Sequence, residues 1–267
     1  MGKFVEQLKR VGQRRAATVG FARAAAQNQS TNMLVAVYLE ELDASLIKKA
    51  SSQGANAIMV APPNKIEESV ATKFSGSLSD VPWGITLTPG DLGDSHPLGE
   101  PDFVVLKDLA TPANVLGSDK RDVLLALDTA LPDAAIRAAD ALAVGALVIE
   151  LAPSDVLTIE HLIACQRVAL LTQKPVIASI PSAWGADVLP HLRDVGIKCV
   201  LLNLAGAEVG KVAEFCEAAR ALGPPRSPFK ELDAMVPASA FRPSYQKKEE
   251  EDEEEEDSLH ANHFRHH

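Results

Sequence analysis

Eight short apolar runs recur along this chain, and each is rich in valine, isoleucine and leucine. None alternates cleanly between apolar and polar residues. A strand without that alternation is typically buried on both faces, as in a parallel sheet covered by helices. The runs are Leu34–Leu39, Ala57–Ala61, Trp83–Leu87, Phe103–Leu106, Val123–Leu127, Ala146–Leu151, Val176–Ile180 and Cys199–Leu204.

Most of the segments between these runs have the features of helices. Asp43 is suited to cap a helix that continues through Gln53, and Gly54 is suited to end it. Further helices are expected over residues 65–74, 132–143, 158–172, 186–195 and 210–222. Eight strands joined by helical crossovers predict a closed (β/α)8 barrel, the TIM-barrel architecture, in which a functional site lies at the carboxyl ends of the strands.

Two neighbouring crossovers depart from the regular pattern. The segment Gly90–Pro101, between the third and fourth runs, is rich in glycine and proline, which oppose a helix. Thr111–Arg121, between the fourth and fifth, has room for one or two helical turns. We therefore expect reduced helices on this flank of the barrel. Because uncovered strands and apolar patches attract partners, the flank is a candidate surface for a homo-oligomer.

The N-terminal segment 3–16 is predicted to form an amphipathic helix, because four apolar residues fall at helical spacing. They are Phe4, Val5, Leu8 and Val11. We expect this helix to cover the bottom of the barrel, and the alternative is a basic helix that lies on a membrane or a partner. Thr18–Ala22 is a ninth apolar segment and an alternative first strand, although few residues separate it from Leu34 for a crossover.

Charge is distributed unevenly along the 267 residues. The net charge is −10, of which Lys247–Asp257 contributes −7, while the first 23 residues carry +5. Glu249–Asp257 has no apolar residue and is expected to be disordered. The expected organisation is an N-terminal helix and extra strand (1–32), the TIM-barrel domain (33–223), a proline-rich extension (224–246) and an acidic, histidine-containing tail (247–267).

Composition and missing motifs exclude several classes of function. No apolar run approaches the roughly 18–20 residues of a transmembrane segment. Three widely spaced cysteines argue against a disulfide framework and favour the cytoplasm. The absence of HxH, HExxH, CxxC, GxGxxG and GxxxxGK[ST] patterns argues against a zinc site and against dinucleotide or P-loop nucleotide cofactors. Basic residues are not interleaved with aromatics, so we expect no nucleic-acid partner. The expected ligand is a small molecule.

Polar residues at the ends of the runs are the candidates for chemistry. Desolvation of Lys107 would free its amine to attack a carbonyl group, with Asp128 and Glu150 shuttling protons. Alternatively, Lys107 forms a structural pair with a carboxylate or extends outward to solvent. Lys107 and Asp108 are adjacent, so only one of them can face the barrel lumen. The strand-end residues considered are Glu40, Glu41, Asn64, Thr88, Lys107, Asp108, Asp128, Glu150, Ser179 and Ser182.

The last two strand–helix units carry the sequences KPVIASI at 174–180 and VGIKCVLLNLAGAEVG at 195–210. This part of the chain resembles the closing units of aldolase-like and phosphate-binding TIM barrels. The resemblance implies that the backbone amides of Ala205, Gly206 and Ala207 could hold a phosphate group. A tight turn between a strand and a helix is the alternative explanation of the same residues.

Two functional hypotheses follow. The first is a lyase- or isomerase-type enzyme that acts on a small phosphorylated or carbonyl-bearing metabolite. The second is a non-catalytic barrel that serves as a binding or assembly module. An open barrel mouth that brings Lys107, Asp128 and Glu150 together would favour the enzyme, and a mouth filled with apolar side chains would favour the module.

Overall fold

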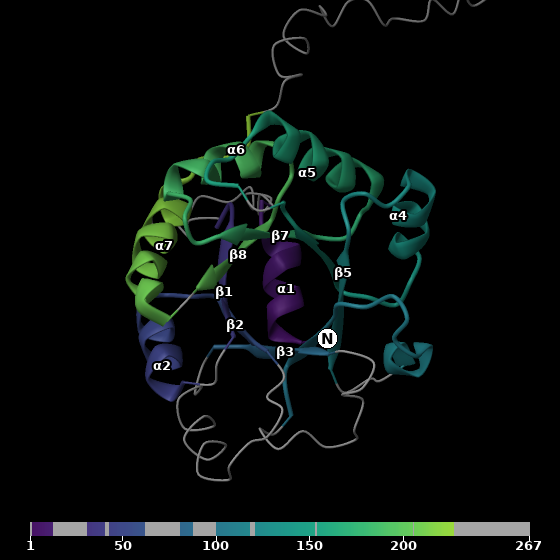
Figure 1. Ribbon diagram of the computed structural model, residues 1–267, viewed down its shortest axis with the longest axis horizontal. Helices are drawn as coiled ribbons and strands as arrows, with labels where there is room; N and C mark the ends of the chain where they lie inside the picture. Colours follow the sequence, from purple (N-terminus) through teal and green to yellow (C-terminus); the bar gives the residue numbers. More distant parts are fainter. Residues whose placement is uncertain are drawn as a thin grey trace, which may run out of the picture. The chain divides into compact units, whose positions relative to one another are not determined.

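The computed structural model describes residues 2–12, 31–40, 43–61, 81–87, 100–117, 121–152, 154–204 and 206–226. Eight parallel strands pair in sequence order and close into a barrel, because β1 pairs with both β2 and β8 (Figure 1). This confirms the predicted TIM barrel and identifies the run at residues 34–39 as its first strand. The strands are β1 (Leu34–Leu39), β2 (Ala57–Val60), β3 (Trp83–Leu87), β4 (Phe103–Leu106), β5 (Asp122–Leu127), β6 (Ala146–Glu150), β7 (Val176–Pro181) and β8 (Cys199–Leu204).

The helices follow the strands largely as the sequence predicts. α2 begins where Asp43 Oδ1 accepts a hydrogen bond from the Ser45 amide at 2.7 Å. α5 begins at a capping box in which His161 takes the place of the usual glutamate or glutamine opposite Thr158. The helical elements are α1 (Lys3–Arg10), α2 (Ala44–Ser52), η1 (Ala113–Gly117), α4 (Asp133–Asp140), α5 (Ile159–Leu171), η2 (Ala186–Val188), α6 (Leu189–Asp194), η3 (Gly206–Gly210) and α7 (Lys211–Ala221).

The helix layer is thin beside β4 and β5, as expected. Within the described residues the only helical element between these strands is the five-residue 3-10 helix η1. Several predictions lie outside the described residues. These are the helix over 65–74, the glycine-rich segment between the third and fourth strands up to residue 99, the ninth apolar segment Thr18–Ala22 and the acidic tail.

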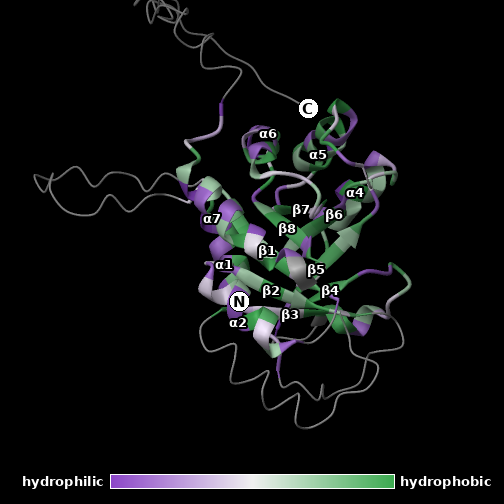
Figure 2. Ribbon diagram, turned by 60° about the vertical axis from the view of Figure 1, so that its left-hand side comes forward, coloured by the Kyte–Doolittle hydropathy of each residue, from purple (hydrophilic) through white to green (hydrophobic). Residues whose placement is uncertain are grey.

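The barrel wall separates two apolar clusters. The outer cluster lies between strands and helices, and includes Ile47 of α2, Ile136 of α4 and Val168 of α5. The inner cluster fills the lumen with side chains from alternate positions of the strands, such as Val105 and Leu201. Burial on both faces accounts for the absence of alternation in the sequence, and Figure 2 shows the strands coloured mostly as hydrophobic.

Helix α1 closes the amino-terminal end of the lumen and appears inside the ring of strands in Figure 1. Phe4, Val5 and Leu8 are fully buried and belong to the inner cluster. The Phe4 ring packs on Phe103 of β4 with 4.9 Å between ring centroids. The Gly2 amide donates a hydrogen bond of 2.7 Å to the carboxylate of Asp122, at the start of β5. The expected lid is therefore confirmed, although the helix ends at Arg10.

Two glycines make room for this packing. A Cβ atom at Gly84 of β3 would collide with the ring of Phe103, so the lumen has space for that ring only because residue 84 has no side chain. In the same way, a Cβ atom at Gly145, just before β6, would press on Val5 of α1 at 2.8 Å. The bottom of the barrel is thus filled by aromatic and aliphatic side chains that approach bare backbone.

The remaining expectations concern compartment and membrane. Cys165, Cys199 and Cys216 are all buried free thiols, which pack as small apolar residues. In the part of the chain that the structure describes, no helix has the length and apolar character needed to cross a bilayer.

Candidate active site at the barrel mouth

The carboxyl-terminal end of the barrel holds a cavity of about 340 Å³. Its floor is formed by lumen residues such as Met59, Val105 and Val148, and its polar groups come from the strand ends above them. The cavity therefore combines an apolar base with a polar rim, which is typical of a small-molecule site. The polar lining residues are Tyr38, Glu40, Lys107, Glu150, Ser179 and Asn203.

An ion pair between Lys107 and Glu150 lines this cavity. Lys107 Nζ lies 3.1 Å from Glu150 Oε1, and it also lies 5.1 Å from the ring centroid of Tyr38. The two charged side chains retain 39% and 60% of their exposure. A pair this exposed contributes little to folding. Structural stability therefore does not explain why both charges lie in the mouth.

The strand pattern determines which side chains reach the mouth. Lumen-facing residues alternate along each strand, so Lys107 continues the row of Val105, and Glu150 continues the row of Val148. Register places Ser179 of β7 beside Glu150. The polar groups of neighbouring strands thus meet at one level of the barrel.

The structure does not bring Asp128 into this group. Asp128 follows the last residue of β5, where its Oδ1 accepts a hydrogen bond from the Ala130 amide at 2.8 Å, and it does not line the cavity. Asp108 makes the same type of turn with the Ala110 amide at 2.8 Å. Of the adjacent residues Lys107 and Asp108, the lysine therefore lines the mouth. The catalytic roles of Lys107, Asp128 and Glu150 remain predictions.

The predicted phosphate site is described in part. Gly206 and Ala207 begin the 3-10 helix η3, while Ala205 lies outside the described residues. In the same turn, the pKa of Glu208 is lowered by a hydrogen bond with Ser182 and by nearby Lys211, although burial opposes this shift. A carboxylate that stays ionised here would repel a phosphate group. Phosphate binding by this turn also remains a prediction.

The remaining strand-end candidates are divided between the mouth and other places. Glu40 and Ser179 line the cavity, whereas the Ser182 carbonyl accepts a hydrogen bond of 2.5 Å from Lys211 Nζ. Glu41, Asn64 and Thr88 lie outside the described residues.

Two mouth residues were not among the candidates from the sequence. Tyr38 and Asn203 lie in the last layer of β1 and β8 and pair in register. Each lies one residue before the end of its apolar run, as Glu150 and Ser179 do. The signal that could have found them is parity, since residues two positions after the lumen residues Ala36 and Leu201 must also face inward.

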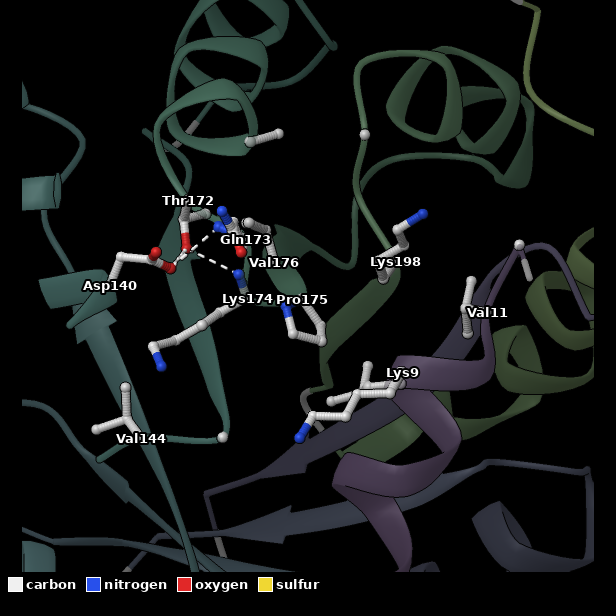
Figure 3. Close-up of a pocket in the computed structure, with 15 residues that line it drawn as sticks. Lys9, Val11, Asp140, Val144, Thr172, Gln173, Lys174, Pro175, Val176 and Lys198 are labelled. Atoms are coloured by element: carbon white, nitrogen blue, oxygen red, sulfur yellow. Dashed lines mark hydrogen bonds between the residues drawn. The ribbon is translucent and has the colours of Figure 1, made fainter. Parts of the chain in front are cut away.

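A second cavity of about 730 Å³ lies at the opposite end, beside α1 (Figure 3). Lys9 and Lys174 line it, but its one acidic side chain is already bound. Asp140 accepts hydrogen bonds from the Thr172 hydroxyl at 2.5 Å and from the Gln173 amide at 3.0 Å. These bonds tie the end of α4 to the loop after α5. The arrangement suits the stabilising role usual at the amino-terminal face of such barrels.

Metal ligation finds no support at either end. Within the described ranges, no group of three or more histidine, cysteine, aspartate or glutamate side chains is placed to hold an ion.

Comparison with known proteins supports the fold and leaves the activity open. No family model matches the sequence, and no curated protein matches it either. Among solved structures, the chain is similar to thiamine phosphate pyrophosphorylase from Pyrococcus furiosus, with 13% identity, a TM-score of 0.55, and coverage of 72% of this chain and 97% of that one. A tryptophan synthase alpha-subunit mutant from the same organism gives 14% identity, a TM-score of 0.54, and coverage of 69% and 98%.

A third similar structure is tryptophan synthase from Mycobacterium tuberculosis, with 11% identity, a TM-score of 0.55, and coverage of 72% of this chain and 93% of that one. These likenesses and the closed barrel define the chain as a TIM-barrel protein. The expected general resemblance to such barrels is confirmed. Because one barrel fold hosts many chemistries, the activity has to be argued from the mouth itself.

Proposed function

We propose that this protein is a lyase- or isomerase-type enzyme that acts on a small carbonyl-bearing metabolite at the barrel mouth. The observation that carries the proposal is the Lys107–Glu150 pair, which lines a cavity at the end of the barrel where TIM-barrel enzymes carry out their chemistry. At about 340 Å³, the cavity suits a metabolite of a few carbon atoms. The buried cysteines agree with a cytoplasmic location.

The surroundings of Lys107 favour a charged role for this residue. Both the carboxylate of Glu150 and the face of Tyr38 lie where they attract an ammonium group. A Schiff base would require the neutral amine. We therefore propose that Lys107 binds the carbonyl oxygen as a cation, in preference to attacking the carbonyl carbon.

Glu150 would then move the proton. It would take a proton from the carbon next to the carbonyl group, and the electron pair would move into the carbonyl to form an enolate oxygen, which Lys107 stabilises. Where the deprotonated carbon carries a hydroxyl group, transfer of the hydroxyl proton to the enolate oxygen and return of the abstracted proton to the former carbonyl carbon complete an isomerisation. Departure of a leaving group from the adjacent carbon completes a lyase reaction. Ser179 and Asn203 would orient the substrate by hydrogen bonds.

Proton exchange with solvent tests this proposal without knowledge of the natural substrate. We would incubate the protein in D2O with pyruvate, 2-oxobutyrate and dihydroxyacetone phosphate, and follow loss of the C–H signals by NMR. The wild type is expected to exchange at least one compound, and Glu150→Gln to slow that exchange by about 100-fold or more. Glu217→Gln, on the exposed side of α7, is the matched control.

The two roles of Lys107 predict different results. Lys107→Met should weaken binding and exchange, while Lys48→Met on α2 should change neither. Borohydride treatment should not attach a carbonyl compound to Lys107. If it does, Lys107 forms a Schiff base and does not act as a cation that binds the carbonyl oxygen. Exchange that is absent for the whole panel, or that persists in Glu150→Gln, would overturn the enolate chemistry.

A non-catalytic binding or assembly module is the second candidate function. It is favoured by the thin flank beside β4 and β5, where η1 gives little cover and Leu109 remains 60% exposed. This candidate predicts a specific ligand or self-association without turnover. It also predicts that substitutions on the flank change association and leave the mouth unaffected.

A further inference from the structure

Helix α5 has apolar side chains on both of its faces. His161, Cys165 and Val168 are buried against the barrel. On the opposite face, Ile159 and Leu170 are 76% and 78% exposed. Single exposed apolar residues are common on protein surfaces, but a row of large ones along one helix face is typical of an interaction site. The outer face of α5 therefore lacks a partner within the described part of the chain.

The exposed residues form one continuous ridge. Ile159, Ile163, Gln166 and Leu170 recur at intervals of four, three and four residues, which places them on one side of the helix. Ile163 is 61% exposed, and Val156 extends the ridge before the helix at 63%. In Figure 1, α5 lies in the outer ring of helices. The ridge therefore faces away from the barrel.

The ridge has the chemistry of a surface that pairs with itself. None of the ridge residues is charged, and the exposed carboxylates of Asp155 and Glu160 lie beside the ridge. Arg167 is directed elsewhere, because its guanidinium group lies 2.6 Å from the Asp133 carboxylate and binds the Thr129 and Leu131 carbonyls. Charge thus gives no reason for this face to select an oppositely charged partner.

The size of the ridge is also adequate for a weak dimer. Four largely exposed aliphatic side chains amount to roughly 500 Å² of apolar surface, a size at which the largest patch on a protein is often functional. A standard interface buries about 800 Å² on each partner, with an apolar centre and a polar rim. The aliphatic side chains of the ridge would contribute most of that centre, together with Gln166, and residues of α4, which packs beside α5, would add to the rim.

We propose that the outer face of α5 mediates a two-fold symmetric homodimer in which the two α5 helices pack antiparallel. The spacing along the ridge is self-complementary in this direction. A two-fold axis between residues 164 and 165 pairs Ile159 with Leu170 of the second copy, and Ile163 with Gln166. Because α5 begins at the mouth end of the barrel, the two mouths open in opposite directions and remain accessible.

Sedimentation velocity with single variants tests the surface. The wild type should shift from 28.4 kDa toward twice that mass, with a Kd of about 1–50 µM. Leu170→Glu should stay monomeric across the same concentrations. Leu109→Glu is the matched control, since it is the same substitution at another exposed leucine. It should dimerise as the wild type does.

A charge-pair experiment tests the direction. Ile159→Glu and Leu170→Lys should each be monomeric alone, and mixing them should restore a dimer, because the antiparallel arrangement brings glutamate and lysine together. Each new charge also suits its end of the helix, so both variants should keep the wild-type circular dichroism spectrum.

Three results would overturn the proposal. The first is a wild type that remains monomeric well above the expected Kd. The second is disruption of the dimer by Leu109→Glu but not by Leu170→Glu, which would assign the interface to the thin flank. The third is a mixture of the two charge variants that stays monomeric, which would exclude antiparallel pairing.

Discussion

Replacement of Phe4 by alanine tests whether α1 is an integral part of the barrel. Phe4 is 1% exposed and stacks on Phe103 at 4.9 Å between ring centroids. Removing a buried phenylalanine side chain costs about 3–5 kcal/mol, because transfer free energy is lost and a cavity remains. Lys3→Ala, one position away on the exposed face, should change the free energy of unfolding by less than about 0.5 kcal/mol.

The measurement is urea or thermal unfolding followed by circular dichroism. For a barrel of this size, the expected loss corresponds to a melting temperature lowered by about 6–20 °C. Hydrogen exchange adds a local measurement, because weaker docking of α1 should expose the Gly2–Asp122 hydrogen bond before global unfolding.

A change below about 1 kcal/mol in Phe4→Ala, equal to that of Lys3→Ala, would mean that α1 does not fill the lumen. If Phe4→Ala is as stable as the wild type and the wild type binds lipid vesicles, α1 would instead be a helix that lies on a membrane surface.

Three further predictions use other parts of the barrel. Asp140→Asn should cost about 1 kcal/mol at neutral pH. Hydrogen bonds from the Thr172 hydroxyl and the Gln173 amide lower the pKa of Asp140. The carboxylate therefore stabilises the folded state above its ordinary pKa, and this stabilisation is lost as the pH falls. The difference in unfolding free energy between the wild type and Asp140→Asn should thus narrow below about pH 4. Burial raises the pKa of Cys165 to about 12 and of Cys216 to about 11 and also raises that of Cys199, so a thiol reagent at pH 8 should label no cysteine in the native protein and three in urea. Gly84→Ala should lower the free energy of unfolding by about 3 kcal/mol or more, because the added methyl group collides with the buried Phe103 ring. A variant whose unfolding free energy is within about 0.5 kcal/mol of the wild type would contradict this packing.

The strand positions could be predicted because burial on both faces leaves a direct signal. Every residue of β2 and β4 is buried, and the corresponding runs in the sequence are wholly apolar. The capped start of α2 at Asp43 was equally clear, because an N-cap is a local interaction. Local signals of this kind determine the elements, and the rule that parallel strands need helical crossovers then determines the barrel.

The mouth was harder to predict because it depends on register. Lys107 and Glu150 are 43 positions apart in the sequence, and only the offset between neighbouring strands decides whether they meet. Asp128 has the parity to join them, yet β5 ends at Leu127 and the following turn captures its carboxylate. The sequence pattern identifies strand ends, but the residue at which a strand gives way to a turn depends on hydrogen bonds that leave little trace in composition.

Helix α1 explains how an exposed ion pair can hold a defined geometry at the opposite end. A TIM barrel with an empty base would have to fill its lumen from the strands alone, and here Phe4 of α1 packs on Phe103, which lies across Gly84. The layers above then pack on a rigid floor, and Val105 beneath Lys107 belongs to the same inner cluster. Rigid support below a site preserves the separation of its charges, while the charges themselves add little stability. Weakening α1 should therefore disturb the mouth through its floor, and conservative changes at Lys107 or Glu150 should leave the stability of the barrel nearly unchanged.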